Sequence, residues 1–126
     1  MTALFDTGVL LDYLRGDRRA VRVLDAHEHR AISVISWLEL MAIAPLPLRE
    51  DTRGFLYSFE RLSVSEAIAD EALRLVLEHP GLSLQRALSW ATARANQLRF
   101  VTADAEHLPE DASEVSVPYR RRAQRR

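Results

Sequence analysis

The sequence predicts a single α/β domain built on a mostly parallel five-stranded sheet with helices on both faces. Short apolar segments alternate with longer segments in which apolar residues recur at helical spacing, which is typical of strand–helix–strand units. A chain of 126 residues suits one domain. A hydrophobic content of 48% and a charged content of 28% are those of an ordinary globular protein.

The chain opens with the shortest of these units. Residues 3–5 are apolar and predict a short strand, and Val9, Leu10 and Leu14 continue at helical spacing. Asp6 therefore lies where a strand hands over to a helix. Ligands bind at this edge of open α/β sheets, but Asp is also a preferred helix N-cap, so both interpretations stay open.

The next segments predict two further strand–helix units. We expect a helix over residues 17–29 and a strand over 31–35. The S-x-x-E pattern from Ser36 to Glu39 is a capping box that predicts a helix start, and Pro45 ends that helix. A helix is then expected across residues 55–62, followed by a weak strand at 62–64.

The second half of the chain repeats the alternation. Another S-x-x-E pattern, at residues 63–66, predicts a helix that stops at 79–81. The clearest helical pattern covers residues 84–97, where small alanines on the apolar face allow close packing on a sheet. Strands are expected at residues 99–102 and 115–117.

Charge is unevenly distributed along the chain. All 17 basic residues are arginines, and five of them lie in the last seven residues. The body before Arg120 has 12 basic and 18 acidic residues, a net charge of −6. We therefore expect a domain over residues 1–119 and a basic, flexible tail over 120–126 that is either solvated or attracted to phosphate.

Three acidic residues fall at the carboxyl edge of the predicted sheet. Asp6 follows the first strand, Glu39 lies in the first turn after the second, and Asp104 follows the fourth. Carboxylates gathered at one edge repel one another unless a cation joins them, and hard oxygen ligands suit Mg²⁺ or Mn²⁺. Such an ion activates water and stabilises charge on a phosphoryl group. Glu39 and Asp104 can instead be simple helix caps.

Other functional classes find little support. Asp12, Asp17 and Asp25 are expected to face solvent, and the four histidines do not converge. The chain has no Cys, no G-x-S-x-G nucleophile motif and no Gly-rich nucleotide loop. No apolar run is long enough for a membrane span and no signal peptide precedes the first strand, so we expect a cytoplasmic protein without a membrane partner.

Three segments together resemble the PIN-domain family, and especially VapC-type ribonuclease toxins of toxin–antitoxin pairs. They are LFDTGVLLDYLRGD, ISVISWLEL and LSLQRALSWATARANQLRFVTADAEHL, in consistent order over residues 3–117. The resemblance implies a three-layer α/β/α domain and Mg²⁺- or Mn²⁺-dependent endonucleolytic cleavage of RNA. It carries the catalytic and metal-binding roles onto Asp6, Glu39 and Asp104. It also implies a homodimer and a small antitoxin that covers the site.

One position departs from the family pattern. The family has Asp before the Ala-Leu pair of the long helix, whereas here Arg86 precedes Ala87 and Leu88. A guanidinium at the acidic edge would weaken metal binding and can pair with Glu39 or Asp104. Two hypotheses follow: a metal-dependent ribonuclease toxin, or a catalytically weak or inactive PIN-like protein that binds an antitoxin-like partner or RNA without cleaving it.

Overall fold

Five parallel strands form one sheet at the centre of the computed structural model, which describes residues 2–109 and 112–121. Their order across the sheet is β3-β2-β1-β4-β5. The predicted α/β class with a five-stranded parallel sheet is confirmed. The strands are β1 (Ala3–Phe5), β2 (Arg30–Ser33), β3 (Glu60–Leu62), β4 (Arg99–Val101) and β5 (Val115–Ser116).

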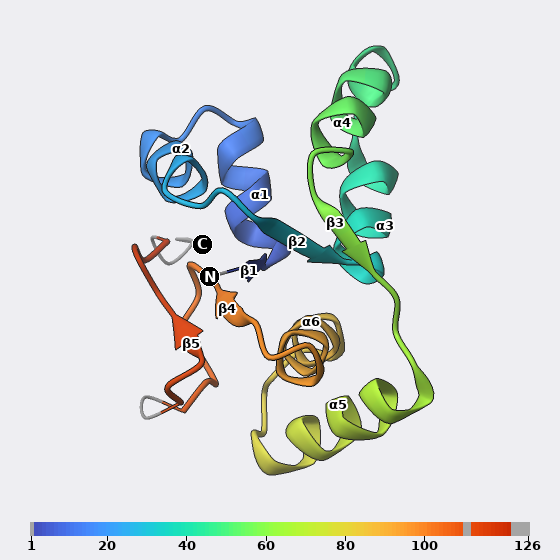
Figure 1. Ribbon diagram of the computed structural model, residues 1–126, viewed down its shortest axis with the longest axis vertical. Coiled ribbons are helices and arrows are strands. Elements are labelled where there is room, and N and C mark those ends of the chain that lie inside the picture. The colour runs from blue at the N-terminus through green and yellow to red at the C-terminus, as the bar shows by residue number, and fades with distance from the viewer. Residues whose placement is uncertain (1, 110–111, 122–126) are drawn as a thin grey trace.

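Helices cover both faces of this sheet, which gives the three expected layers. Figure 1 shows α5 and α6 on one side of the strands and α1 to α4 on the other, with α3 and α4 next to β3. The helices are α1 (Thr7–Leu14), α2 (Arg18–Asp25), α3 (Val34–Ile43), α4 (Arg49–Leu56), α5 (Glu66–Glu78) and α6 (Leu84–Ala95), with a 3₁₀ turn η1 (Leu46–Leu48).

Each face of the sheet has its own hydrophobic core. Phe5 of β1 packs into the cluster formed with α1 to α4, whereas Leu4 points the opposite way toward α5 and α6. Successive residues of a strand alternate between faces, so a three-residue strand is enough to join both cores. Ala87, Ala91 and Ala93 of α6 are fully buried, as the predicted close helix–sheet packing requires, whereas Ala95 in the last turn is exposed.

Helix α3 begins earlier than the sequence predicted. Ser33, not Ser36, is its N-cap, and its side chain accepts a hydrogen bond from the Ser36 backbone N–H. The prediction that Ser36 and Glu39 form a capping box is therefore wrong. Ser36 lies in the first turn and Glu39 one turn further on, so the Glu39 carboxylate is not engaged in capping.

Other element limits also differ from the prediction. Helix α2 ends at Asp25 rather than at residue 29. The helix predicted over residues 55–62 is wrong for most of its length, because α4 covers Arg49–Leu56 and the strand β3 already begins at Glu60. Helix α5 is capped by Ser65, whose side chain accepts from the Ile68 N–H, so the capping box predicted at residues 63–66 is also wrong.

The described part of the chain contains no helix long and apolar enough to cross a membrane. The predicted boundary between residues 119 and 120 stays a prediction, because residues 122–126 lie outside the described residues. Arg120 and Arg121, the first residues of the expected tail, both contact the body of the domain.

Candidate functional site at the carboxyl edge of the sheet

Asp6 occupies the junction between β1 and α1, with 5% of its surface exposed. One carboxylate oxygen accepts from the Thr7 backbone N–H at 2.9 Å. The other accepts from the Thr102 hydroxyl at 2.8 Å and from Arg86 Nε at 3.3 Å. Asp6 is thus both a helix cap, as one interpretation of the sequence had it, and a member of a polar cluster that joins β1, α6 and the end of β4.

Glu39 approaches the same edge from α3. Its Oε1 lies 2.8 Å from the Thr7 hydroxyl, which also lies 2.8 Å from Ser36 Oγ. An ionised carboxylate only accepts hydrogen bonds, so the Thr7 proton points at Glu39. Thr7, which directly follows Asp6, therefore links the Glu39 carboxylate of α3 to the start of α1.

Asp104 lies in the loop after β4. Its Oδ1 accepts from the Glu106 backbone N–H at 3.0 Å, and its own N–H donates to the Thr102 hydroxyl at 3.2 Å. The segment after it forms a turn and not a helix, so the alternative interpretation of Asp104 as a helix cap is wrong. Its side chain is 46% exposed, whereas that of Asp6 is 8% exposed.

Arg86 is placed where the sequence predicted, on the first turn of α6 at the acidic edge. Its Nε lies 3.3 Å from Asp6 Oδ2, and its Nη1 lies 3.8 Å from Asp104 Oδ2. The guanidinium also donates to the backbone carbonyls of Glu106 and Asp104 and, at 3.4 Å, to the Thr102 hydroxyl. Only 15% of its side chain is exposed. The ion pair with Asp104 was anticipated, whereas the contact with Asp6 takes the place of one with Glu39.

These groups converge on one small pocket of about 220 Å³. Asp6, Glu39 and Asp104 all line it, together with Arg86 and Arg121. The three acids that the sequence placed at one edge of the sheet therefore share a cavity at that edge.

The donor chemistry of this pocket suits a hard divalent ion, because it offers carboxylate and hydroxyl oxygens and no thiolate. The arrangement of these side chains, however, does not suit such an ion. No group of three or more His, Asp or Glu side chains within residues 2–109 and 112–121 is placed to hold one ion. Across the same residues every buried side-chain nitrogen and oxygen already has a hydrogen-bond partner. The Arg86 guanidinium takes the oxygen of Asp6 that an ion would need, so the residues as arranged do not fit a bound divalent ion.

The sequence did not single out the hydroxyl residues of the site. Thr102 links Asp6, Asp104 and Arg86, and Thr7 contacts Glu39. A signal for both existed in the sequence, since each is a hydroxyl residue next to or two residues from a predicted acidic ligand. Hydroxyls in such positions fix the rotamers of carboxylates.

Asp12 was expected to face solvent and instead has only 7% of its surface exposed. Its carboxylate accepts from the Tyr119 hydroxyl at 2.8 Å and pairs with Arg121 at 3.2 Å. Burial, and then the hydrogen bond to Asp12, raise the pKa of Tyr119 well above its usual value. No spacing in the sequence announces this contact, because its partners lie more than 100 residues apart.

Of the other acids expected to face solvent, Asp25 is exposed as predicted, whereas Asp17 is a helix cap and only partly exposed. Asp17 caps α2, and the Arg19 guanidinium that binds its carboxylate, together with the Arg19 backbone N–H, lowers the pKa of Asp17 to about 2. Glu66 follows β3 at the far edge of the sheet, away from β1 and β4. None of these residues belongs to the pocket.

Comparisons with known proteins agree with this architecture. The chain is similar over 94% of its length to a chain of a toxin–antitoxin complex from Klebsiella pneumoniae, with 33% identity, 98% of that chain covered and a TM-score of 0.86. It also has the fold of chains in FitAcB from Neisseria gonorrhoeae, with 23% identity, 85% and 90% of the two chains covered and a TM-score of 0.68. It also has the fold of a chain in DNA-bound VapBC from Salmonella typhimurium, with 16% identity, 92% and 98% of the two chains covered and a TM-score of 0.73. No curated protein matches the chain.

The family model of the PIN domain matches residues 3–110. This match covers β1 to β4 and all the helices, and therefore every acid of the pocket. The chain belongs to the PIN domain family.

Proposed function

We propose that this protein is the toxin of a toxin–antitoxin pair and an endoribonuclease that requires Mg²⁺ or Mn²⁺, acting through Asp6, Glu39 and Asp104. The observation that carries the proposal is the convergence of these carboxylates on one pocket at the carboxyl edge of a parallel sheet. Ligand sites of open α/β sheets lie at this edge.

The partner part of the proposal is supported by the relatives and by the surface. Similar structures are described as toxin–antitoxin, FitAcB and VapBC assemblies. Large apolar side chains are exposed on α3, η1 and α4, and exposed apolar groups in such number are typical of surfaces that another protein covers. They are Leu38, Ile43, Leu46, Leu48 and Tyr57. A small antitoxin and a second copy of this chain are the partners we propose.

Arg86 sets the condition for activity. Its guanidinium holds Asp6 and Asp104 and must give up those contacts before a divalent ion can engage the same carboxylates. We therefore propose that the enzyme needs more Mg²⁺ or Mn²⁺ than a site with an acid at position 86 would.

The same contact supports a second candidate function. A guanidinium that already neutralises the acids removes the need for a metal ion, because it supplies the missing positive charge itself. On this alternative the protein binds an antitoxin-like partner or RNA at this edge and does not cleave.

A cleavage assay across a Mn²⁺ titration separates the two candidates. The endoribonuclease proposal expects cleavage of a mixed single-stranded RNA pool that rises with Mn²⁺ and is absent in EDTA. Asp6→Asn should abolish it, because the carboxylate at the centre of the cluster is lost. Arg99→Gln at the start of β4, which is exposed and lies at the opposite edge of the sheet, is the matched control and should cleave normally.

Absence of cleavage at every Mn²⁺ concentration would leave the non-cleaving candidate. Equal cleavage by Asp6→Asn would point to a contaminating nuclease and count against the proposal. The partner part is tested independently, by looking immediately upstream for a small reading frame and co-expressing its product, and by the molar mass of the purified protein in solution.

A further inference from the structure

A groove much larger than the acidic pocket runs beside it. It encloses about 1140 Å³, above the ~300–1,000 Å³ typical of small-molecule sites, and so has room for a polymer segment. The groove and the acidic pocket share Ala103, Asp104 and Arg121 as lining residues. The two hollows are therefore continuous at the end of β4.

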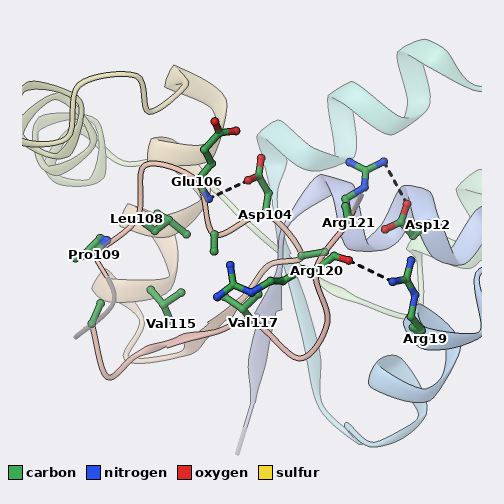
Figure 2. Close-up of a pocket in the computed structure, with 13 residues that line it drawn as sticks. Asp12, Arg19, Asp104, Glu106, Leu108, Pro109, Val115, Val117, Arg120 and Arg121 are labelled. Atoms are coloured by element: carbon green, nitrogen blue, oxygen red, sulfur yellow. Dashed lines mark hydrogen bonds and ion pairs between the residues drawn. The ribbon is translucent and has the colours of Figure 1, made fainter. Parts of the chain in front are cut away.

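The two sides of this groove differ in chemistry. Leu108, Val115 and Val117 supply an apolar side from the segment between β4 and the end of the described chain. Arg19, Arg120 and Arg121 supply the other side (Figure 2). Of the three acids that line the groove, Asp12 is paired with Arg121 and Asp104 with Arg86, whereas Glu106 has 77% of its side chain exposed.

Residues 117–121, which we call the C-terminal strap, bring these arginines to the groove. The Tyr119 hydroxyl donates to Asp12 at 2.8 Å, and the Arg19 guanidinium lies 4.7 Å above the Tyr119 ring. Arg19 also donates to the Arg120 carbonyl at 3.2 Å, and the Arg121 N–H donates to the Ala103 carbonyl at 3.0 Å. These contacts fix the backbone of the strap and leave the side chain of Arg120 to extend toward Val117 in the groove (Figure 2).

Arg121 stands at the junction of the groove and the acidic pocket. Its Nη2 pairs with Asp12, while its Nη1 lies 3.1 Å from the point where a Cβ on Gly8 would sit. Glycine at the start of α1 thus makes room for the guanidinium beside Asp6. With 36% of its side chain exposed, Arg121 keeps N–H donors accessible to a ligand.

We propose that this groove is the binding track for single-stranded RNA next to the cleavage site, with Arg120 and Arg121 as its phosphate-binding residues. The inference rests on the proposed function and adds to it where the substrate lies. Phosphate binds best to guanidinium groups, whereas the apolar side suits the bases and riboses of an unpaired strand. Unlike a peptide, such a strand carries one negative charge per nucleotide, which matches a row of arginines.

The test uses the full-length protein in EDTA, so that binding is measured without cleavage. The probe is a fluorescein-labelled single-stranded RNA of about 12 nucleotides, followed by anisotropy at several salt concentrations. Arg120→Gln and Arg121→Gln should each weaken binding on the order of three- to tenfold and each lower the salt slope by about 0.7. Arg99→Gln removes the same charge at the opposite edge and should change neither quantity.

Gly8→Ala tests the position of Arg121 without changing charge. Its Cβ would crowd the Arg121 guanidinium, so RNA binding should weaken although Ala favours the helix and the melting temperature should not fall. Unchanged affinity in both arginine variants, or equal weakening in Arg99→Gln, would overturn the proposed track and leave the endoribonuclease proposal standing. RNA binding that depends on Arg120 and Arg121 but comes without cleavage at any Mn²⁺ concentration would support the proposed track and count against the endoribonuclease proposal.

Discussion

At the scale of single residues, Arg86 decides how the acidic pocket behaves. Its guanidinium contacts Asp6 and Asp104 with only 15% of the side chain exposed, so the pocket holds an internal cation. Two unit charges about 6 Å apart interact by roughly 3 kcal/mol at an effective dielectric constant of ~20. A divalent ion in the same pocket would meet a larger repulsion, reduced by the solvent at its open side.

Arg86→Asp should therefore tighten Mn²⁺ binding and raise nuclease activity. The substitution changes the local charge by two units and frees the Asp6 oxygen that the guanidinium holds. Since ~1.4 kcal/mol corresponds to a tenfold change in affinity, we expect the dissociation constant to fall tenfold or more. Isothermal titration with Mn²⁺ on both forms measures it.

The control for this prediction is Arg99→Asp, which makes the same charge change at the opposite edge and should leave Mn²⁺ affinity as it is. A second readout is thermal: in EDTA, Arg86→Asp should melt lower than the natural protein because its acids are no longer neutralised, and added Mn²⁺ should restore the loss. Equal Mn²⁺ affinities of the natural protein and Arg86→Asp would contradict the role assigned to Arg86.

Sequence reasoning placed the acids correctly because their positions depend on local order. Asp6 and Asp104 follow strands, and in a parallel sheet the ends of strands share one edge. The contacts of Asp12 depend instead on where residues 119 and 121 return to α1. Local patterns carry no information on such a long-range contact, so Asp12 was taken for a surface residue.

At the scale of elements, the N-terminus of α6 determines where Arg86 points. Ser83 caps this helix by accepting the Arg86 backbone N–H at 3.2 Å. Ser83→Ala should cost about 1 kcal/mol of stability, measured by urea unfolding. Ser65→Ala removes the corresponding cap of α5 and should cost a similar amount.

Of these two variants, only Ser83→Ala should alter Mn²⁺ affinity. Helix α6 carries Arg86, whereas α5 carries none of the pocket residues. An equal effect of both variants on Mn²⁺ affinity would mean that global stability, and not the direction of Arg86, governs the pocket.

The C-terminal strap makes a prediction about pH. Burial and the hydrogen bond to Asp12 raise the pKa of Tyr119, so above pH ~10 the unfolded chain loses a phenol proton that the folded protein keeps. Stability should therefore fall as pH rises above this value. Tyr119→Phe should remove this part of the pH dependence, which thermal melts between neutral pH and pH ~11 would detect. An identical pH dependence in both forms would show that Tyr119 is not held as described.

The elements themselves were predictable in type and less so in their limits. Both capping boxes failed in the same way, since the true caps, Ser33 and Ser65, are other serines nearby. Adjacent serines have the same local propensity to cap a helix, so tertiary packing selects which of them becomes the cap. In α3 this selection matters for function, because it moves Ser36 and Glu39 from capping to the pocket.

At the scale of the whole molecule, the strand order explains why the site lies where it does. With β1 at the centre and β4 beside it, the loops after both strands meet, and α3 brings Glu39 from the strand on the other side. The strap then crosses the ends of these loops, where Arg121 donates to Ala103. The site is therefore assembled from residues near both ends of the chain.

This assembly gives the two parts of the basic tail different expected roles. Arg120 and Arg121 contact the body, whereas residues 122–126 add three further arginines to the chain. A chain that ends at Arg121 should fold normally and keep the RNA contacts of the groove, losing only salt-dependent affinity through its lost charges.

A chain that ends at Tyr119 should also fold, because Tyr119 and Asp12 remain, but it should lose the two groove arginines as well. RNA anisotropy at several salt concentrations should then show two successive decreases in slope, the second of about 1.4 for two phosphate contacts. An unchanged slope between the two truncated chains would remove the groove arginines from RNA binding, and loss of a cooperative melt in the longer one would show that the tail is needed for folding.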